Sequence, residues 1–414
     1  MLSLQWREMV RGHVAWPAIC RWFWNPARPA VRHHRDVADV ERDRVPSPHG
    51  APFPVREGNR VRPLIDGEPA FRRVCEAIEA AERSVWVTVT FLWEACRMPD
   101  GRGTPLEVLG RAAARGVDVR VVFWRPGDEL ASLRENAFWG APRHLQRLRD
   151  EAPGVRVRWD RAAEGFCQHQ KLWLVDAGGP AAVAFAGGIN LNPHSMVGPG
   201  HARPGENHDV YVELSGPATA DVHRAFAERW NGATDPTADD DLPLPDHDTV
   251  PAATGSARVQ VQRTVHPTRT PDGRGERTIL EQTLLAIGAA RDTLYLEHQR
   301  IDLPEVVDAL RAAAERGVAI TAVVPAADQH DAGLLALAGH PRFTLVGLTA
   351  SAPDGSRHPV WVHSKVMIVD DAWATVGSAN LHRHSLTGNA ELNLAIWDPS
   401  FARELREELE RERA

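Results

Sequence analysis

The chain is almost without lysine. Its 414 residues include forty-six arginines but only Lys171 and Lys365, and both lysines fall in the pattern His-x-Lys-x-x-x-x-Asp, at residues 169–176 and 363–370. Arginine is a wide planar fork, whereas lysine is a compact point charge that suits a crowded site gripping a tetrahedral anion. The two lysines therefore predict a phosphate-binding site. The alternative is a chance placement of both lysines in ordinary buried strands.

Cysteine and long apolar runs are scarce as well. The four cysteines are too few and too scattered for a disulfide framework, which predicts a reducing, cytoplasmic location. No run of about 18 apolar residues occurs, so we expect no membrane span. The N-terminus also lacks the apolar core of a secretory signal.

An excess of positive charge is missing too. The formal charge of −7 and the pI near 6.3 disfavour a broad cationic surface that would hold nucleic acid. Residues 1–35 are the exception, because six arginines and one acidic residue are interleaved there with tryptophans. This mixture favours peripheral contact with an anionic membrane. A helix folded over the core or a free tail is the alternative, and Pro17 and Pro26 would limit any helix to short pieces.

The sequence repeats itself beyond the two lysine motifs. A helical pattern followed by Arg-Gly-Val and an apolar strand occurs at residues 106–123 and again at residues 306–324. Each half alternates helix and strand before its motif. This predicts an α/β fold with two similar lobes related by a pseudo-twofold axis, each a mixed or mostly parallel sheet flanked by helices.

Composition suggests four segments. Residues 1–55 are an N-terminal segment with an irregular, proline-rich lead-in, and residues 56–235 are the first lobe. Residues 236–275 begin with an acidic, proline-containing run and are predicted to be a linker. Residues 276–414 are the second lobe.

The motifs place one imidazole and one ammonium together in each half. Side chains two residues apart on a strand share a face, so each histidine lies beside its lysine. A pseudo-twofold axis would then gather two histidines and two lysines around one pocket. Each motif is followed by Gly-x-x-Asn, at residues 187–190 and 377–380. We expect the phosphate to be bound by Lys171, Lys365, Asn190, Asn380 and Ser378.

Two histidines can divide the work on a phosphodiester. One acts as a neutral nucleophile while the other, protonated, delivers a proton to the leaving alkoxide. Each ring needs an acceptor to fix its tautomer, and Asp209 and Glu391 occupy corresponding positions in Asn-His-Asp-Val and Asn-Ala-Glu-Leu. We expect these carboxylates to orient His169 and His363, although surface charges on a strand are the alternative.

Other polar residues receive different roles. Asp176 and Asp370 lie beyond an apolar run that would carry them about 20 Å from their histidines, so they are predicted to be structural turn or ion-pair residues. His201 with His208, or His382 with His384, could ligate a metal, but no carboxylate or cysteine cluster with metal-site spacing accompanies them. We expect neither a metal nor a cofactor.

The duplicated motifs resemble the phospholipase D superfamily over residues 60–410. Residues 362–381 and 389–394 are especially similar to bacterial cardiolipin synthases, and residues 187–191 and 208–209 resemble the same branch. The resemblance implies a metal-independent reaction through a phosphohistidine, with His169 as nucleophile and His363 as acid. The symmetric motifs do not make that choice themselves.

The sequence also departs from that family. Cardiolipin synthases of this type usually carry N-terminal membrane spans, and Gln170 stands where arginine is common. Residues 382–385 replace an expected acidic residue followed by Arg-Ser. We expect a phosphatidyltransferase or phospholipase D acting on phospholipids; a nuclease, a small-molecule phosphodiester enzyme and a non-catalytic scaffold are the alternatives. The sequence does not indicate whether water or an alcohol is the acceptor, and it predicts no oligomeric state.

Overall fold

The structure is a computed structural model that describes residues 44–236, 243–245, 249–326 and 330–413. These residues belong to one compact unit, Ala38–Ala414. The arginine- and tryptophan-rich segment predicted to contact membranes lies outside the described residues. In the part of the chain that is described, no helix combines the length and the apolar character needed to cross a bilayer.

The first lobe is built on a mixed sheet. Its strands are β1 (Arg56–Ile65), β2 (Ser84–Val89), β3 (Asp118–Trp124), β4 (Arg156–Asp160), β5 (Leu172–Val175), β6 (Val183–Gly187), β8 (Val210–Ser215) and β9 (Asp235–Pro236). β2, β3 and β4 run parallel, whereas β2–β5, β5–β6, β6–β8 and β8–β1 pair antiparallel. The first lysine motif therefore enters the middle of the sheet on β5.

The second lobe repeats this order. Its strands are β10 (Ala257–Val265), β11 (Glu276–Arg277), β12 (Thr293–His298), β13 (Ala319–Pro325), β14 (Phe343–Ser351), β15 (Arg357–Pro359), β17 (Lys365–Val369), β18 (Trp373–Gly377) and β19 (Glu391–Trp397). Here β12, β13 and β14 are parallel, and β12–β17, β17–β18, β18–β19 and β19–β10 are antiparallel. β1 and β10 join the two sheets, with Arg56 opposite Val259. The predicted α/β fold of two similar lobes is confirmed.

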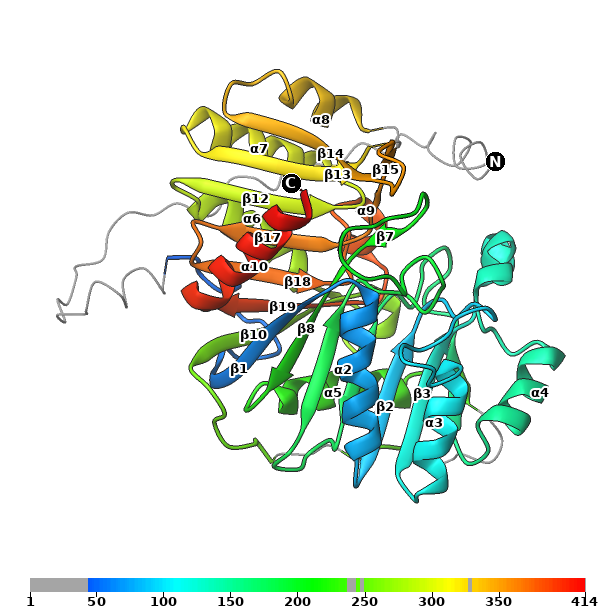
Figure 1. Cartoon of the computed structure of the whole chain (residues 1–414). Helices are drawn as coiled ribbons and strands as arrows, with labels where there is room; N and C mark the ends of the chain where they lie inside the picture. Colours follow the sequence, from blue (N-terminus) through cyan, green and yellow to red (C-terminus); the bar gives the residue numbers. More distant parts are fainter. Residues whose placement is uncertain (1–43, 237–242, 246–248, 327–329, 414) are drawn as a thin grey trace. The chain divides into compact units, whose positions relative to one another are not determined.

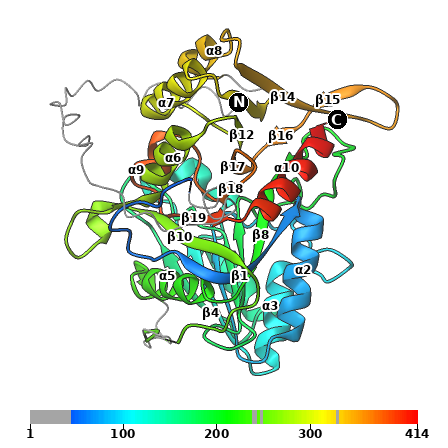
Figure 2. The same ribbon diagram turned by 90° about the vertical axis from the view of Figure 1, so that its left-hand side faces the viewer.

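Helices cover the sheets. They are α2 (Gly67–Ala80), α3 (Pro105–Ala114), α4 (Pro142–Glu151), α5 (Thr219–Asn231), α6 (Thr278–Ala289), α7 (Pro304–Glu315), α8 (Ala332–Leu337), α9 (Arg383–Thr387) and α10 (Pro399–Arg413), with 3₁₀ turns at Asp128–Asn136 and Pro267–Arg269. In Figures 1 and 2, α2 and α3 lie on one side of the first sheet and α5 lies on the other. The repeated Arg-Gly-Val is the end of α3 and of α7, where Gly116 and Gly317 take positive φ angles of 88° and 101°.

The apolar core has three parts. One cluster packs α2 and α3 on the first sheet, and another packs α6 and α7 on the second. The third cluster joins both sheets with α5 and α10, and it includes Phe226, Trp230 and Leu405. β10 contributes Val259 and Val261 to this central cluster, although it falls within the segment predicted to be a linker. The alternation of valine with polar residues in β10 is a strand pattern, but the acidic run before it led to the prediction of a linker over the whole segment.

Candidate active site

Two short cross-lobe pairings bring the motifs together. β7 (Asn207–His208) runs parallel to β16 (Trp361–Val362), so the chain before Asp209 lies beside the chain before His363. A single bridge between Gln168 and Ala390 is the equivalent contact on the other side. The backbone N–H of His169 donates to Ala390 O at 2.9 Å, and that of His363 donates to His208 O at 2.8 Å. Each histidine is thereby placed beside the carboxylate of the opposite lobe.

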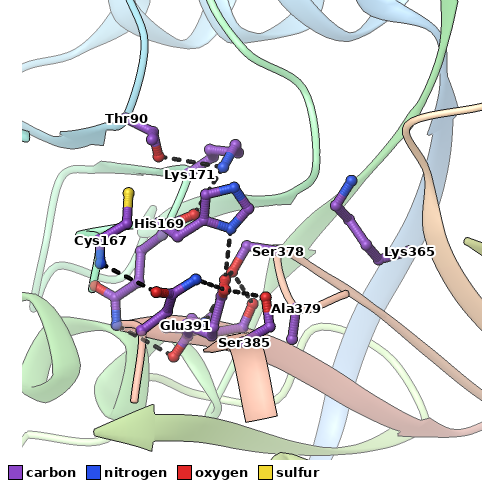
Figure 3. A network of polar contacts seen from close by, with 12 residues as sticks. Thr90, Cys167, His169, Lys171, Lys365, Ser378, Ala379, Ser385 and Glu391 are labelled. Atoms are coloured by element: carbon purple, nitrogen blue, oxygen red, sulfur yellow. Dashed lines mark hydrogen bonds and ion pairs between the residues drawn. The ribbon is translucent and has the colours of Figure 1, made fainter. Parts of the chain in front are cut away.

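The first of the two resulting half-sites contains His169 and Glu391. His169 Nδ1 lies 2.9 Å from Glu391 Oε2. Ser378 Oγ donates to Oε2 and Ser385 Oγ donates to Oε1, both at 2.6 Å (Figure 3). Asn389 Nδ2 donates to Oε1 at 3.2 Å. Burial pushes the pKa of Glu391 upward, but His169, Lys171 and the hydrogen bond from Ser378 outweigh it and hold that pKa below its usual value. Glu391 is therefore an ionised acceptor for the His169 ring.

The second half-site contains His363 and Asp209. His363 Nδ1 lies 2.6 Å from Asp209 Oδ2, while the backbone N–H of Val210 donates to Asp209 Oδ1 at 2.8 Å. Gly188 lies against this carboxylate, because a Cβ added there would come within 2.2 Å of Asp209 Oδ1. Gly188 corresponds to Ser378 in the repeat. One half-site thus fixes its carboxylate with a backbone N–H and close packing, and the other fixes it with hydroxyls and an amide.

Both lysines are buried and lie close to the histidines. Lys171 Nζ donates to His169 O at 2.8 Å and to Thr90 Oγ1 at 3.1 Å, and Lys365 Nζ donates to His363 O. Burial is the main cause that lowers the pKa of Lys171 to about 8 and that of Lys365 to about 7, against the attraction of Glu391 and Asp209. The nearby carboxylates do not fully offset the cost of burying the two ammonium charges, so a bound anion would stabilise both charges.

The same surroundings act on the imidazoles. Burial first, and then Lys171, lowers the pKa of His169, although Glu391 opposes the shift. Burial and then Lys365 lower the pKa of His363 to about 4, against Asp209. Both rings are therefore neutral at pH 7 in the free site. The sequence analysis expected one of the two histidines to be protonated, and the protein without substrate does not provide that protonated ring.

The remaining residues of the predicted site fall in two groups. Asn190 and Asn380 are buried after β6 and β18, and the Oδ1 atom of each has no hydrogen-bond partner. Asn190 lines a small cavity together with Lys171 and Thr90. The Ser378 hydroxyl donates a hydrogen bond to Glu391. This contact orients the Glu391 carboxylate, whereas the sequence analysis expected Ser378 to contact the phosphate.

Asp176 and Asp370 lie at the far ends of their strands. Each has a positive φ, 52° and 49°, and each carboxylate accepts hydrogen bonds from three successive backbone N–H groups, those of residues 82–84 and 291–293. These carboxylates join the turn after the motif strand to the start of the neighbouring strand. Their positions agree with the structural role expected from sequence.

Sequence reasoning missed a buried charged layer beneath the second half-site. His208 Nδ1 lies 3.1 Å from Asp66 Oδ1, and His208 Nε2 lies 2.9 Å from Glu297 Oε2. Burial opposes a charge on His208, but Glu297 and Asp66 raise the pKa of His208 well above its usual value. No metal ligands were expected, yet Asp66, His201 and His208 have side-chain atoms within ligand distance of one another. Among the described residues, His382 and His384 belong to no such group.

The family described as "Cardiolipin synthase, PLD-like domain" matches residues 74–230 and 284–413, and these ranges contain both half-sites. The chain belongs to this family. The predicted membership of the phospholipase D superfamily, close to bacterial cardiolipin synthases, is thereby confirmed, as is the prediction of an enzyme.

Individual relatives of this phospholipase D-like chain also include bacterial proteins named cardiolipin synthase A. It is 29% identical over 366 residues to cardiolipin synthase A of Pseudomonas entomophila (strain L48), covering 86% of this chain and 69% of the relative. It is 28% identical over 372 residues to cardiolipin synthase A of Pseudomonas aeruginosa (strain LESB58), covering 86% and 67%.

Solved structures share the fold. The phosphatidylserine synthase of Haemophilus influenzae Rd KW20 has a TM-score of 0.54 and 13% identity, with 92% of this chain and 90% of that chain covered. The polyphosphate kinase of Porphyromonas gingivalis has a TM-score of 0.51 and 17% identity, with 85% and 50% covered. Identities this low demonstrate a common fold and carry nothing about substrate.

Proposed function

We propose that the protein is a cardiolipin synthase-like phosphatidyltransferase that acts on phospholipids through a phosphohistidine and needs no catalytic metal. The observation that carries the proposal is the crosswise pairing of each motif histidine with the carboxylate of the opposite lobe, beside two buried lysines. One lobe alone would hold a histidine without its acceptor. The repeat therefore makes a single site from two incomplete halves.

In the proposed first step His169 is the nucleophile. Glu391 accepts a hydrogen bond from the Nδ1–H of His169, which fixes the tautomer and leaves the Nε2 lone pair free to attack the phosphorus of a phospholipid. The new N–P bond forms as the bond to the headgroup oxygen breaks. His363 gives its Nε2 proton to that leaving alkoxide, and Asp209 stabilises the imidazolium beforehand. The choice of His169 over His363 rests on the family resemblance.

The second step reverses the first. An acceptor hydroxyl gives its proton to His363 and attacks phosphorus, and the N–P bond breaks to restore neutral His169. A second phospholipid with a free glycerol hydroxyl would give a lipid with two phosphatidyl groups, and water would give phosphatidic acid. Exclusion of water from the pocket would therefore decide between transfer and hydrolysis.

Binding of the phosphodiester would favour the protonated form of His363 that the first step needs. Burial, then Lys365 and to a smaller extent Lys171 lower the pKa of His363, and a bound phosphate anion would offset the part due to the lysines and so favour protonation of that ring. Each ammonium at about 4 Å from a phosphate oxygen contributes roughly 4 kcal/mol at an effective dielectric of 20. Two such charges would stabilise the negative charge on the phosphate oxygens, as a divalent metal ion does in metal-dependent phosphodiester enzymes.

Turnover of labelled phosphatidylglycerol in vesicles, with a chelator present, tests the proposal. We expect free glycerol together with a doubly phosphatidylated lipid or phosphatidic acid. His363→Ala should lose the activity, and the exposed histidine variant His49→Ala should keep it. Absence of turnover on phosphatidylglycerol, phosphatidylcholine and phosphatidylethanolamine, together with cleavage of single-stranded DNA under the same conditions, would replace the phospholipid with a nucleic acid.

A further inference from the structure

A second cluster of polar groups is buried beneath the proposed catalytic pocket. Asp66 follows β1 at the start of α2, His201 lies in the loop after β6, and His208 is in β7. The side chains of Asp66 and His208 have no exposed surface, and that of His201 is 1% exposed. The cluster thus joins three segments that are distant in sequence.

Several atoms of this cluster lack a partner. His201 Nε2 lies 3.2 Å from Asp66 Oδ2, but neither atom makes a hydrogen bond of acceptable geometry, and His201 Nδ1 has none either. His208 Nδ1 lies 3.1 Å from the other oxygen of Asp66. Buried polar atoms without partners are uncommon and indicate a missing water or ion. The Asp66 carboxylate therefore faces two imidazoles, and one ligand atom from each of the three residues lies within 4.8 Å of the others.

We propose that Asp66, His201 and His208 bind one divalent transition-metal ion of the Zn²⁺ class. The ligands would be the carboxylate of Asp66, Nε2 of His201 and Nδ1 of His208. Zn²⁺ prefers imidazole and carboxylate at bond lengths of about 2.0–2.2 Å, which place neighbouring ligand atoms roughly 3.3 Å apart in a tetrahedron. The carboxylate–imidazole separations of 3.1 Å to Asp66 Oδ1 and 3.2 Å to Asp66 Oδ2 are close to this spacing, and one ligand atom from each of the three residues lies within 4.8 Å of the others.

Two glutamates, Glu297 and Glu412, lie beside the three proposed ligands. Glu297 Oε2 accepts from His208 Nε2 at 2.9 Å, which is the carboxylate support that metal-bound histidines usually have. Glu412 Oε2 on α10 lies 3.8 Å from His201 Nε2 and accepts from the backbone N–H of Gly200, so it can move into a fourth position. Binding of the ion displaces the Nδ1 proton of His208 to solvent and keeps its Nε2 proton.

The ion would have a structural role. Asp66 accepts a hydrogen bond from the backbone N–H of Asp209 at 3.1 Å and donates its own N–H to Asp209 O at 2.8 Å. An ion on Asp66 would therefore stiffen the backbone that carries the carboxylate of the second half-site. The ligands are too deeply buried to meet substrate, so this proposal stands apart from the metal-free transfer chemistry.

Metal analysis of the untagged, full-length protein tests the site. After chelator treatment and dialysis against Zn²⁺, mass spectrometry of the metal content should give about one ion per chain. His201→Ala should lose the ion, whereas His194→Ala, an exposed histidine of the same loop, should retain it. Equal zinc content in both variants, or less than about a tenth of an ion in the parent chain, would overturn the proposal.

A measurement on the unmodified chain avoids any folding defect of a variant. Co²⁺ replaces Zn²⁺ in such sites, and four-coordinate Co²⁺ absorbs strongly in the visible range. We expect this band to appear at one equivalent of Co²⁺ and to vanish when Zn²⁺ is added. If Co²⁺ gives only the weak absorption of its hydrated ion, the cluster is a hydrogen-bonded ionic network and holds no metal.

Discussion

The two half-sites have the same plan but different surroundings. Glu391 is held by two serine hydroxyls and an asparagine amide, whereas Asp209 is held by a backbone N–H and lies against Gly188. Beneath Asp209 there is a buried layer of charge centred on His208, and the equivalent position in the repeat is Ala390. The repeat supplies two histidines, and the surroundings make them unequal.

This difference suits two different tasks. A nucleophile needs a fixed ring whose free nitrogen points at phosphorus, and the hydroxyls around Glu391 provide fixed donors for the orienting carboxylate. An acid needs a ring that can take up a proton, and the carboxylate of Asp209 at 2.6 Å opposes the burial and the Lys365 charge that lower the pKa of His363. We therefore expect substitutions in the two half-sites to affect different steps of the reaction.

The largest contrast concerns the leaving group. Asp209→Asn and Glu391→Gln should each slow transfer from phosphatidylglycerol by about 10³-fold or more, because each ring loses its correct tautomer. With a p-nitrophenyl leaving group, which departs without a proton, Asp209→Asn should recover most of its rate and Glu391→Gln should not. The rate of leaving-group release in a single turnover, measured on both substrates, tests this, because the second step still needs His363 as a base. Equal recovery in both variants would mean that the half-sites do not divide acid and nucleophile in this way.

A smaller contrast concerns the residues that support the two carboxylates. Gly188→Ala should slow the reaction by about 100-fold, because the added Cβ would meet Asp209 Oδ1 at 2.2 Å and displace it. Ser378→Ala should cost only about tenfold, since Ser385 and Asn389 still hold Glu391. Single-turnover rates, with circular dichroism to check folding, separate the two. A larger loss in Ser378→Ala would indicate that Ser378 contacts the substrate itself.

The pH dependence distinguishes the two lysines. A lysine binds phosphate only while protonated, and protonation is lost as pH rises through its pKa, here about 7 for Lys365 and about 8 for Lys171. We expect kcat/KM to fall above pH 7, by up to about tenfold per pH unit for each lysine. kcat should hold to higher pH, because bound phosphate raises both pKa values. Lys365→Arg should shift the start of the fall towards pH 8, and an unchanged alkaline limb would assign the limb to other groups.

The smallest effect on rate is expected away from the pocket. Asp176→Asn and Asp370→Asn should each lower the free energy of unfolding by about 1–3 kcal/mol, because each weakens three hydrogen bonds to a carboxylate. Asp370→Asn should be the more costly, since Asp370 also pairs with Arg44 at 3.1 Å. Urea unfolding measures the stability. Both variants should keep the parent kcat at low temperature, and a large loss of kcat in a folded variant would give these residues a part in the site.

Much of this arrangement could be predicted from the chain. The repeat of helix, Arg-Gly-Val and strand gave the two lobes, and the two-residue spacing placed each histidine beside its lysine. The seven-residue spacing to Asp176 and Asp370 was enough to remove them from the pocket. These inferences depend on local periodicity, which a sequence displays directly.

The rest depends on contacts between distant segments. The partner of each histidine follows from the β7–β16 pairing and the Gln168–Ala390 bridge, and no local pattern specifies either contact. Phosphate binding by Ser378 stays a prediction, and its hydrogen bond to Glu391 could not be predicted because Glu391 comes from later in the chain. In the sequence, His208 opposite Ala390 and Gly188 opposite Ser378 in the repeat were signals that the half-sites differ.

Trapping the phosphoenzyme tests the central claim most directly. Protein quenched during turnover of lipid labelled in the phosphatidyl group, then digested and mapped by mass spectrometry, should carry the label on His169. His363→Ala should retain it when the leaving group is p-nitrophenol, and His169→Ala should carry none. A label on His363 in the parent protein would reverse the two roles, and the absence of any label during active turnover would contradict the covalent route itself.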